Sequence, residues 1–141
     1  MTDTVRETII AAFTARAAAL STLPVLRAQR SIGESDARFV SVWDGEDRAV
    51  AVDYGTQKSQ FPLAVECIKK TANHSIEANA IIGEIIALFL NRTFTGKWLK
   101  NELAVASPAY PQDGGNYTTI TVIFYITYET VLGDPYTQKT H

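Results

Sequence analysis

The chain of 141 residues has one cysteine and two histidines, so it is poor in the usual metal ligands and redox groups. A single cysteine excludes an internal disulfide framework. No two histidines stand at the spacing of a zinc site, and no second cysteine completes a ligand set. No apolar run approaches the roughly 20 residues of a membrane-spanning helix, and the first residues lack a signal pattern. We therefore expect a soluble protein with no metal, no cofactor and no membrane contact.

The sequence also lacks an excess of charge of either sign. Thirteen Lys and Arg residues stand against fifteen Asp and Glu residues, which gives a net charge of −2. Binding nucleic acid through its phosphates needs a basic surface, so this balance argues against that role. Hydrophobic residues make up 46% of the chain and charged residues 20%, as in an ordinary folded domain. The length predicts a single domain over residues 1–141.

Apolar periodicity predicts a first helix over residues 4–20. Thr4 and Glu7 fit a capping box, in which the Thr hydroxyl accepts from a backbone N–H and the Glu side chain reaches back. The apolar positions at helical spacing are Val5, Ile9, Phe13, Ala17 and Leu20. This face is expected to pack on a sheet.

A second helix is predicted over residues 75–92, with Ser75 as its N-cap. Its main apolar stripe is read as Ile76, Ala80, Gly83, Ile86 or Ala87, and Leu90, widened by Ile82, Ile85 and Phe89. An apolar face of this width suggests burial on more than one side. The helix is therefore expected to meet the sheet and either the first helix or another subunit.

Strand formers and turn residues predict a hairpin over residues 38–54 that turns at residues 44–47, because Asp-Gly is a favoured turn pair. A third strand follows a second turn and carries Pro62 and Cys67. Proline cannot donate a hydrogen bond to a neighbouring strand. This third strand is therefore expected either to lie at a sheet edge or to begin at Pro62. Cys67 is expected to be a buried, structural thiol.

The last third of the chain is predicted to be β again, with a strand at residues 101–107 and a loop at residues 108–116. The strongest strand pattern covers residues 117–131, which would extend more than about 40 Å at roughly 3.3 Å per residue. Turn residues at 133–136 then mark a short tail. The predicted fold class is α+β, with a mostly antiparallel sheet and two α-helices packed on one face as a two-layer sandwich.

The search for chemistry gives one weak candidate for an enzyme. Asp44, Asp47 and His74 flank predicted elements and could serve a small hydrolase if they met within hydrogen-bond reach. Asp is also common in turns for local backbone reasons, so a structural role in a turn is favoured over a catalytic one. The chain is therefore predicted not to be an enzyme, and no catalytic residue is assigned. A peptide- or ligand-binding module that uses an exposed strand edge is a further alternative.

The layout of the elements is more informative than any site. An amphipathic N-terminal helix leads to an acidic turn, and an apolar middle helix leads to a long Thr/Ile/Tyr strand. The residues that carry this layout are Trp43-Asp44-Gly45-Glu46-Asp47, Tyr128-Glu129-Thr130 and Gly133-Asp134-Pro135-Tyr136. In these features the chain resembles the small tail terminator, or minor tail, proteins of long-tailed phages and prophages, such as the lambda-type tail terminator.

The resemblance implies a structural viral protein without catalytic residues that takes part in virion assembly and head–tail joining. Such a protein forms a ring at the head–tail interface, a homohexamer in this family, and stops polymerisation of the tail tube. Its partners would be other copies of itself, the tail tube protein and a head-completion protein. DNA would pass through the lumen without sequence-specific contact. Its location would be the virion tail, and the host cytoplasm during assembly; a head–tail connector or neck protein is the alternative within this class.

Loop tips on a rigid sheet are the usual place for recognition, so subunit and partner contacts are expected there. The segments are the turn at residues 44–47, the loop at residues 108–116 and the tail at residues 133–136. The candidate interface residues are Asp44, Gly45, Glu46, Asp47, Tyr110, Gln112, Asp113, Asn116, Asp134, Pro135 and Tyr136. A closed ring needs heterologous contacts between two different faces of the same chain.

Overall fold

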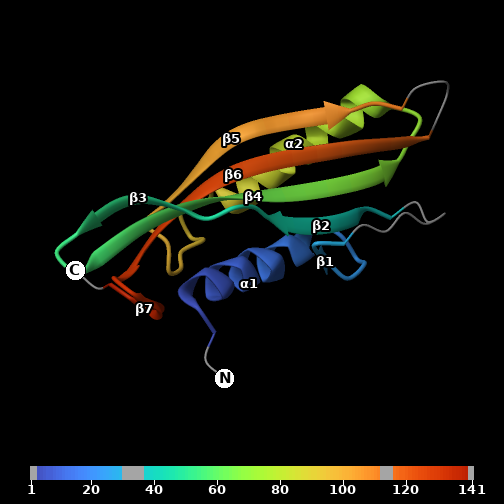
Figure 1. The fold of residues 1–141 in the computed structure, drawn as a ribbon. Coiled ribbons are helices and arrows are strands. Elements are labelled where there is room, and N and C mark those ends of the chain that lie inside the picture. Colours follow the sequence, from blue (N-terminus) through green and yellow to red (C-terminus); the bar gives the residue numbers. More distant parts are fainter. Residues whose placement is uncertain (1–2, 30–36, 112–115, 140–141) are drawn as a thin grey trace.

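A computed structural model describes residues 3–29, 37–111 and 116–139 and shows an α+β fold built on two long central strands (Figure 1). Along the chain the elements are α1 (Val5–Ala17), the 3-10 helix η1 (Ala18–Leu20), β1 (Leu26–Arg27), β2 (Phe39–Asp44), β3 (Arg48–Asp53), β4 (Thr56–Lys70), α2 (His74–Phe89), β5 (Lys100–Ala109), β6 (Tyr117–Val131) and β7 (Asp134–Gln138). The predicted α+β class is therefore confirmed.

The two long strands β4 and β6 pair antiparallel along their whole length and form the spine of the sheet. Each spine strand is flanked on its outer side by two shorter strands in succession. β2 and then β3 pair with β4, whereas β5 and then β7 pair with β6. β1 pairs parallel with β2, so the sheet is mixed, although the other described pairings are antiparallel.

The predicted hairpin over residues 38–54 is wrong. β2 and β3 do not pair with each other, because both pair with β4, at residues 63–68 and 56–60 respectively. The predicted second turn, before the third strand, is the hairpin turn; it joins β3 to β4 at Tyr54 and Gly55. Their φ angles of 40° and 80° are both left-handed, as a type I′ hairpin turn requires. The acidic segment is therefore a link between two successive strands on one side of β4.

The predicted edge position of Pro62 is also wrong, since β4 has neighbours on both sides. Pro62 is tolerated because its backbone faces the gap between β2 and β3. Its carbonyl oxygen accepts a hydrogen bond from Gly45 N at 2.8 Å on that side. The N–H and C=O of a strand residue point to the same side, so the missing N–H would have faced the same gap. β2 ends opposite Leu63 and β3 begins opposite Gln60, so no ladder bond is lost.

Helix α1 matches its prediction closely. The Thr4 side chain accepts from Glu7 N at 3.0 Å, which is half of the predicted capping box. The Glu7 carboxylate does not reach back; it pairs with Arg27, 2.5 Å from Nη1, because that partner carries a full charge. The predicted apolar face, Val5, Ile9, Phe13, Ala17 and Leu20, is buried in full.

Helix α2 differs from its prediction in two respects. The helix begins at His74, so Ser75 is inside it and is not the N-cap. The His74 ring hydrogen-bonds Thr118 Oγ1, which ties the first helical residue to β6. The buried stripe is Ala78, Ile81, Ile85 and Phe89, so two of the residues predicted to widen the stripe are its centre. Of the predicted main stripe, Ile86 packs partly buried against the core, whereas most of the rest is exposed, Ile76 at 74%. Because the helix is apolar almost all round, periodicity alone does not identify the buried side.

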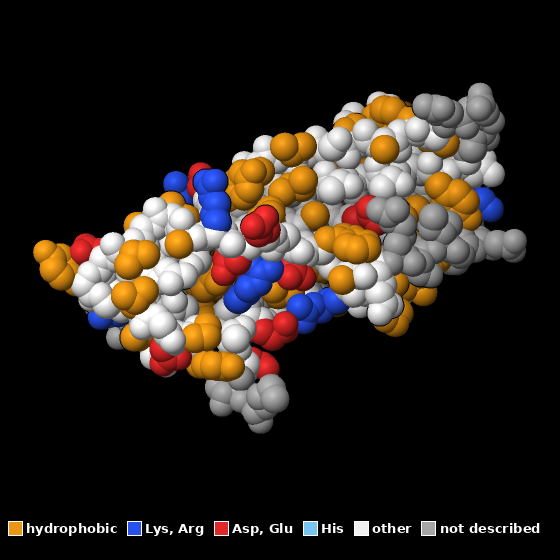
Figure 2. Space-filling view, in the orientation of Figure 1, with side chains coloured by type: hydrophobic (Ala, Val, Ile, Leu, Met, Phe, Trp, Pro, Cys, Tyr) orange, Lys and Arg blue, Asp and Glu red, His pale blue; other side chains and the backbone are white. Residues whose placement is uncertain are grey.

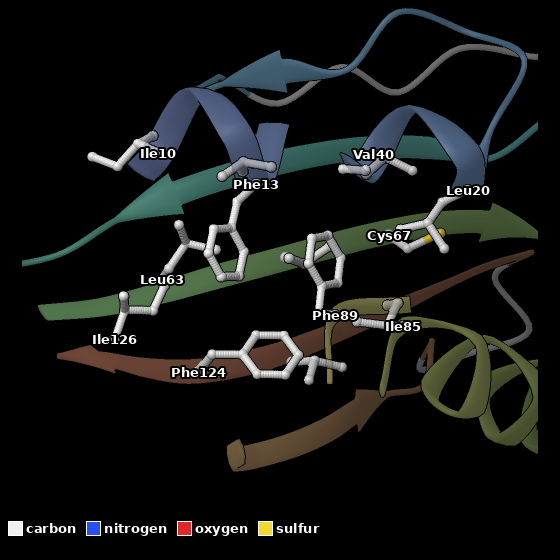
Figure 3. Close-up of a cluster of buried hydrophobic side chains, with 14 of the residues drawn as sticks. Ile10, Phe13, Leu20, Val40, Leu63, Cys67, Ile85, Phe89, Phe124 and Ile126 are labelled. Carbon is white, nitrogen blue, oxygen red and sulfur yellow. The ribbon is translucent and has the colours of Figure 1, made fainter. Parts of the chain in front are cut away.

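The hydrophobic core lies where both helices meet the spine (Figure 3). The rings of Phe13 from α1 and Phe89 from α2 stack, with centroids 5.3 Å apart. Phe124 of β6 lies 5.6 Å from the Phe89 ring, and Leu63 and Cys67 of β4 are buried in the same cluster. Cys67 is therefore the buried thiol that the sequence predicts.

The last third of the chain is more regular than predicted. β6 has the predicted bounds, and β5 extends the predicted strand at both ends so that it includes Pro108. Pro108 is acceptable there because β5 has a neighbour on one side only among the described residues. The predicted tail at residues 133–136 begins a strand, since β7 folds back on β6.

Candidate interaction surface

The acidic segment at residues 44–47, predicted to be a contact loop, is held on the body of the domain. Arg6 Nη2 donates to Asp44 Oδ2 at 2.8 Å and to the Gly45 carbonyl oxygen at 2.7 Å. Arg6 Nη1 lies 3.8 Å from Asp47 Oδ1. α1 and the link between β2 and β3 are therefore joined through one guanidinium group.

The same segment is also joined to the end of β6. Tyr128 Oη donates to Asp47 Oδ2 at 2.5 Å. The Arg6 guanidinium carbon lies 4.4 Å from the centre of the Phe61 ring, at cation–π distance. Asp44 and Asp47 are thus engaged within the chain, and Glu46 is exposed beside them.

Stability should fall at alkaline pH, starting near pH 9. Burial raises the pKa of the Cys67 thiol from 9.0 to about 12. Burial, together with the hydrogen bond to Asp47, also raises the pKa of Tyr128. The unfolded chain loses both protons at lower pH than the folded chain, so folding is weakened by about 1.4 kcal/mol per pH unit for each group once its unfolded pKa is passed.

The measurement is the free energy of unfolding between pH 7 and pH 11 for the wild type, Cys67→Ala and Tyr128→Phe. Each substitution removes one titrating group and should flatten the alkaline slope, with Cys67→Ala acting from about pH 9 and Tyr128→Phe from about pH 10. If both variants keep the wild-type slope, ionisation of Cys67 and Tyr128 does not cause the loss of stability at alkaline pH.

The second predicted segment lies at the opposite end of the spine. Tyr110 follows β5 directly and is about half exposed. Asn116 is exposed, and its carbonyl oxygen accepts from Thr71 N at 2.8 Å. Gln112 and Asp113 lie outside the described residues. The structure therefore places Tyr110 and Asn116 at the surface.

The third predicted segment forms the start of β7. Asp134 accepts from Tyr136 N at 3.0 Å and from Thr137 Oγ1 at 2.7 Å. These hydrogen bonds lower the pKa of the Asp134 carboxyl. Pro135 and Tyr136 are exposed beside it. Asp134 thus fixes the local chain, and Tyr136 is the large side chain that this segment offers to a partner.

A further group of exposed apolar side chains includes only one of the predicted interface residues, Tyr136. It lies where the ends of β4 and β6 extend past both helices together with β3, with β7 next to them in contact with α1 (Figure 1). We call this part the β-arm. Its exposed large hydrophobic side chains are Val50, Val52, Tyr54, Leu132 and Tyr136. Figure 2 shows hydrophobic side chains gathered at this end of the molecule.

The tip of the β-arm consists of two hairpin turns. Leu132 N donates to the Gly55 carbonyl oxygen at 2.7 Å and joins the turn before β4 to the turn after β6. Tyr54 is 97% exposed and has a left-handed backbone, which is uncommon for a bulky residue. A two-residue Tyr-Gly turn after the apolar run of residues 49–52 is the sequence signal that identifies this tip.

The structure does not bring the hydrolase candidate together. His74 contacts Thr118 at one end of β6, and Asp47 contacts Tyr128 ten residues further along that strand. Ten residues of strand extend about 33 Å, far beyond the reach of a general base to its partner. His74 therefore serves the start of α2, while Asp44 and Asp47 serve the Arg6 network.

Other classes of site gain no support. Within residues 3–29, 37–111 and 116–139, no group of three or more His, Cys, Asp or Glu side chains is placed to hold a metal ion. No helix of the described part of the chain is long and apolar enough to cross a membrane. The sequence matches no protein-family model and no curated protein. The interaction surfaces are therefore the basis for a functional proposal.

Proposed function

We propose that this chain is a structural assembly protein of the phage tail terminator type. In this role it forms a homohexameric ring at the head–tail interface, stops polymerisation of the tail tube and lets DNA pass through the lumen. Its partners are other copies of itself, the tail tube protein and a head-completion protein. The proposed architecture is the two-layer sandwich predicted from the order of the elements, and the shared core of α1 and α2 supports it.

The observation that carries the proposal is the β-arm. All six residues of β3 are exposed, and four of them, Ala49 to Val52, are apolar. An exposed apolar strand at a sheet edge invites pairing with another chain, and monomeric proteins usually avoid it. Burying this edge in an assembly would remove the exposed apolar surface from water.

A second surface supports a ring rather than a simple pair. β5 has a free outer edge among the described strands, and Leu103 and Val105 on it are about half exposed. This edge belongs to the β6 side of the spine, whereas β3 belongs to the β4 side. Two unlike contact surfaces on one chain permit the head-to-tail contacts from which closed rings are made.

The proposal predicts a discrete closed ring. The experiment is sedimentation velocity combined with light scattering over a concentration series, with and without purified tail tubes. We expect one assembly of six chains whose population rises with concentration or on addition of tubes. The ring should also shorten the tubes formed when tail tube protein polymerises in its presence. A monomer in every condition, tubes included, contradicts the proposal.

A strand-addition module is the second candidate, because β3 also offers an unpaired edge to an extended peptide. The same series separates the two functions. A peptide-binding module stays monomeric at high concentration and leaves tube length unchanged. A neck or connector protein forms a ring but binds head-completion protein without capping tubes.

A further inference from the structure

The tip of the β-arm carries an aromatic side chain that the isolated chain does not use. Tyr54 is 97% exposed at φ 40°, a backbone conformation that costs a bulky residue of order 1–3 kcal/mol. Asn, Asp or Gly would fill this turn position without that cost. Tyr is among the residues that most often anchor a protein interface. The strained and exposed tyrosine therefore points to insertion into a partner.

A groove of about 360 Å³ lies between the ends of α1 and α2. Its apolar lining comes from small and medium side chains of both helical segments, Ala19, Leu20, Ala87 and Leu88. This volume lies within the range of pockets that enclose small ligands. The groove is thus large enough to receive a single aromatic side chain.

The polar side chains of the groove are mainly basic. Arg38 is paired with Glu84, and Arg16 Nε donates to the Leu88 carbonyl oxygen at 3.3 Å. Within the described residues Arg16 has no ion-pair partner. The groove therefore has one positive charge in excess.

The tip offers the complementary charge. Asp53 directly precedes Tyr54, is exposed, and forms no ion pair with any described residue. A tyrosine that enters the groove would bring the Asp53 carboxylate toward Arg16. Asn91 also lines the groove; its Oδ1 accepts from Thr93 N and Oγ1, both at 2.9 Å, so its amide N–H groups are the ones that can donate to the phenol oxygen.

We propose that the Tyr54 tip of one chain docks in the groove between α1 and α2 of a second copy. The β-arm extends past both helices of its own chain, so the contact joins two chains (Figure 1). Tip and groove are different surfaces, and such a heterologous contact repeats from copy to copy until a ring closes. The inference rests on the proposed function, because it names the contact that builds the ring.

The first test is self-association by sedimentation velocity. Tyr54→Ala removes the aromatic ring that enters the groove. Ala87→Glu places a negative charge in the groove that would repel the Asp53 carboxylate. Each should raise the dissociation constant by about 10-fold or more, as loss of an interface anchor does. The matched controls are Tyr125→Ala, an exposed tyrosine of β6 that belongs to neither the tip nor the groove, and Ala80→Glu, an exposed alanine of α2 outside the groove. Both should stay within about twofold of the wild type.

The second test is cross-linking with a short bismaleimide between chains that carry one added cysteine each. Val52→Cys lies on β3 and keeps Tyr54 and Asp53, and Ala87→Cys lies in the groove. A mixture of the two variants, one of them tagged, should give heterodimers linked between positions 52 and 87. A mixture of Val52→Cys with Ala80→Cys should not. Cys67 is buried and its raised pKa disfavours the reactive thiolate, so the wild type should not cross-link.

The outcomes separate this inference from the proposed function. Rings that keep their wild-type stability in Tyr54→Ala and Ala87→Glu overturn the tip contact and leave the ring in place. Predominant links between two Val52→Cys chains show tip-to-tip pairing and also overturn it. If Tyr54→Ala loses only its binding to tail tubes, the tip serves the tube and the inference fails. A wild type that is monomeric in every condition overturns both proposals.

Discussion

Replacing Phe13 with alanine should lower the free energy of unfolding by about 3–5 kcal/mol, as expected for deleting a fully buried phenyl ring. Phe13 has no exposed surface. Its ring stacks on Phe89 and also contacts Phe94 and Trp98, with centroids 4.9 and 5.0 Å away. One side chain thus holds together α1, α2 and the chain segment that follows α2.

The loss includes a cavity as well as the transfer of the ring to water. Three of its neighbours are rigid aromatic rings, which cannot bend into the vacated space. Incomplete collapse adds to the cost in proportion to the remaining cavity volume. Aromatic pairs also contribute about 0.5–1.5 kcal/mol beyond the area they bury.

Urea unfolding followed by circular dichroism measures this effect. Phe13→Leu keeps most of the volume and should cost clearly less than Phe13→Ala. Tyr136→Ala, which removes a half-exposed aromatic ring, should stay within about 0.5 kcal/mol of the wild type. Equal losses in Phe13→Ala and Tyr136→Ala would show that the cluster around Phe13 is not the centre of the core.

Sequence reasoning predicts well the elements whose large apolar residues follow one clear period. In α1 the few large apolar residues recur at helical spacing and Thr4 is the N-cap, so its buried face and its start are both predicted correctly. β6 alternates over residues 117–131, and its predicted bounds match the structure. α2 is apolar on nearly every side, so its period predicts a helix but not which face is buried.

Strand pairing could not be predicted, because it depends on contacts distant in sequence. The Asp-Gly pair at residues 44 and 45 is typical of a hairpin turn, yet Arg6 from α1 holds it as a link between β2 and β3. Pro62 reads as an edge residue because the gap opposite it is invisible in the sequence. In both cases a contact with a residue distant in sequence determines the structure. Arg6 binds the Asp-Gly segment, and Gly45 donates to the Pro62 carbonyl oxygen.

The candidate surface was predicted only in part for a related reason. Tyr110, Asn116 and Tyr136 are exposed; Asp44 and Asp47 are exposed too, but their carboxylates also bind Arg6 and Tyr128. Tyr54 lies in the turn between β3 and β4. The sequence predicts a turn before the third strand, but no interface residue is predicted in that turn.

The segment between α2 and β5 closes the core through a tight contact at Gly96. A Cβ atom placed on Gly96 would lie 2.2 Å from Trp98 Cζ3, far inside van der Waals distance. The Trp98 ring cannot easily yield, since it packs 4.8 Å from Phe94 and 5.0 Å from Phe13, centre to centre. Glycine is therefore required at position 96 by close approach of the tryptophan ring.

Gly96→Ala should lower the free energy of unfolding by about 1–3 kcal/mol, the usual cost of forcing an extra carbon into packed surroundings. In a Trp98→Ala background the obstacle is gone. The same Gly96→Ala change should then be neutral or stabilise the chain by up to about 1 kcal/mol, because alanine restricts the unfolded state. The coupling between the two positions should thus be about 1–4 kcal/mol, measured as a double-mutant cycle in urea.

Gly83→Ala is the matched control for this cycle. A Cβ atom on Gly83 meets nothing within 4 Å, and the residue lies inside α2. Alanine there should raise stability by about 0.5–1 kcal/mol through helix propensity, and by the same amount with or without Trp98. Additive effects of Gly96→Ala and Trp98→Ala would contradict the close contact. If Gly96→Ala is coupled to Trp98→Ala while Gly83→Ala is additive with it, the requirement for glycine at position 96 comes from the tryptophan ring and not from backbone preference.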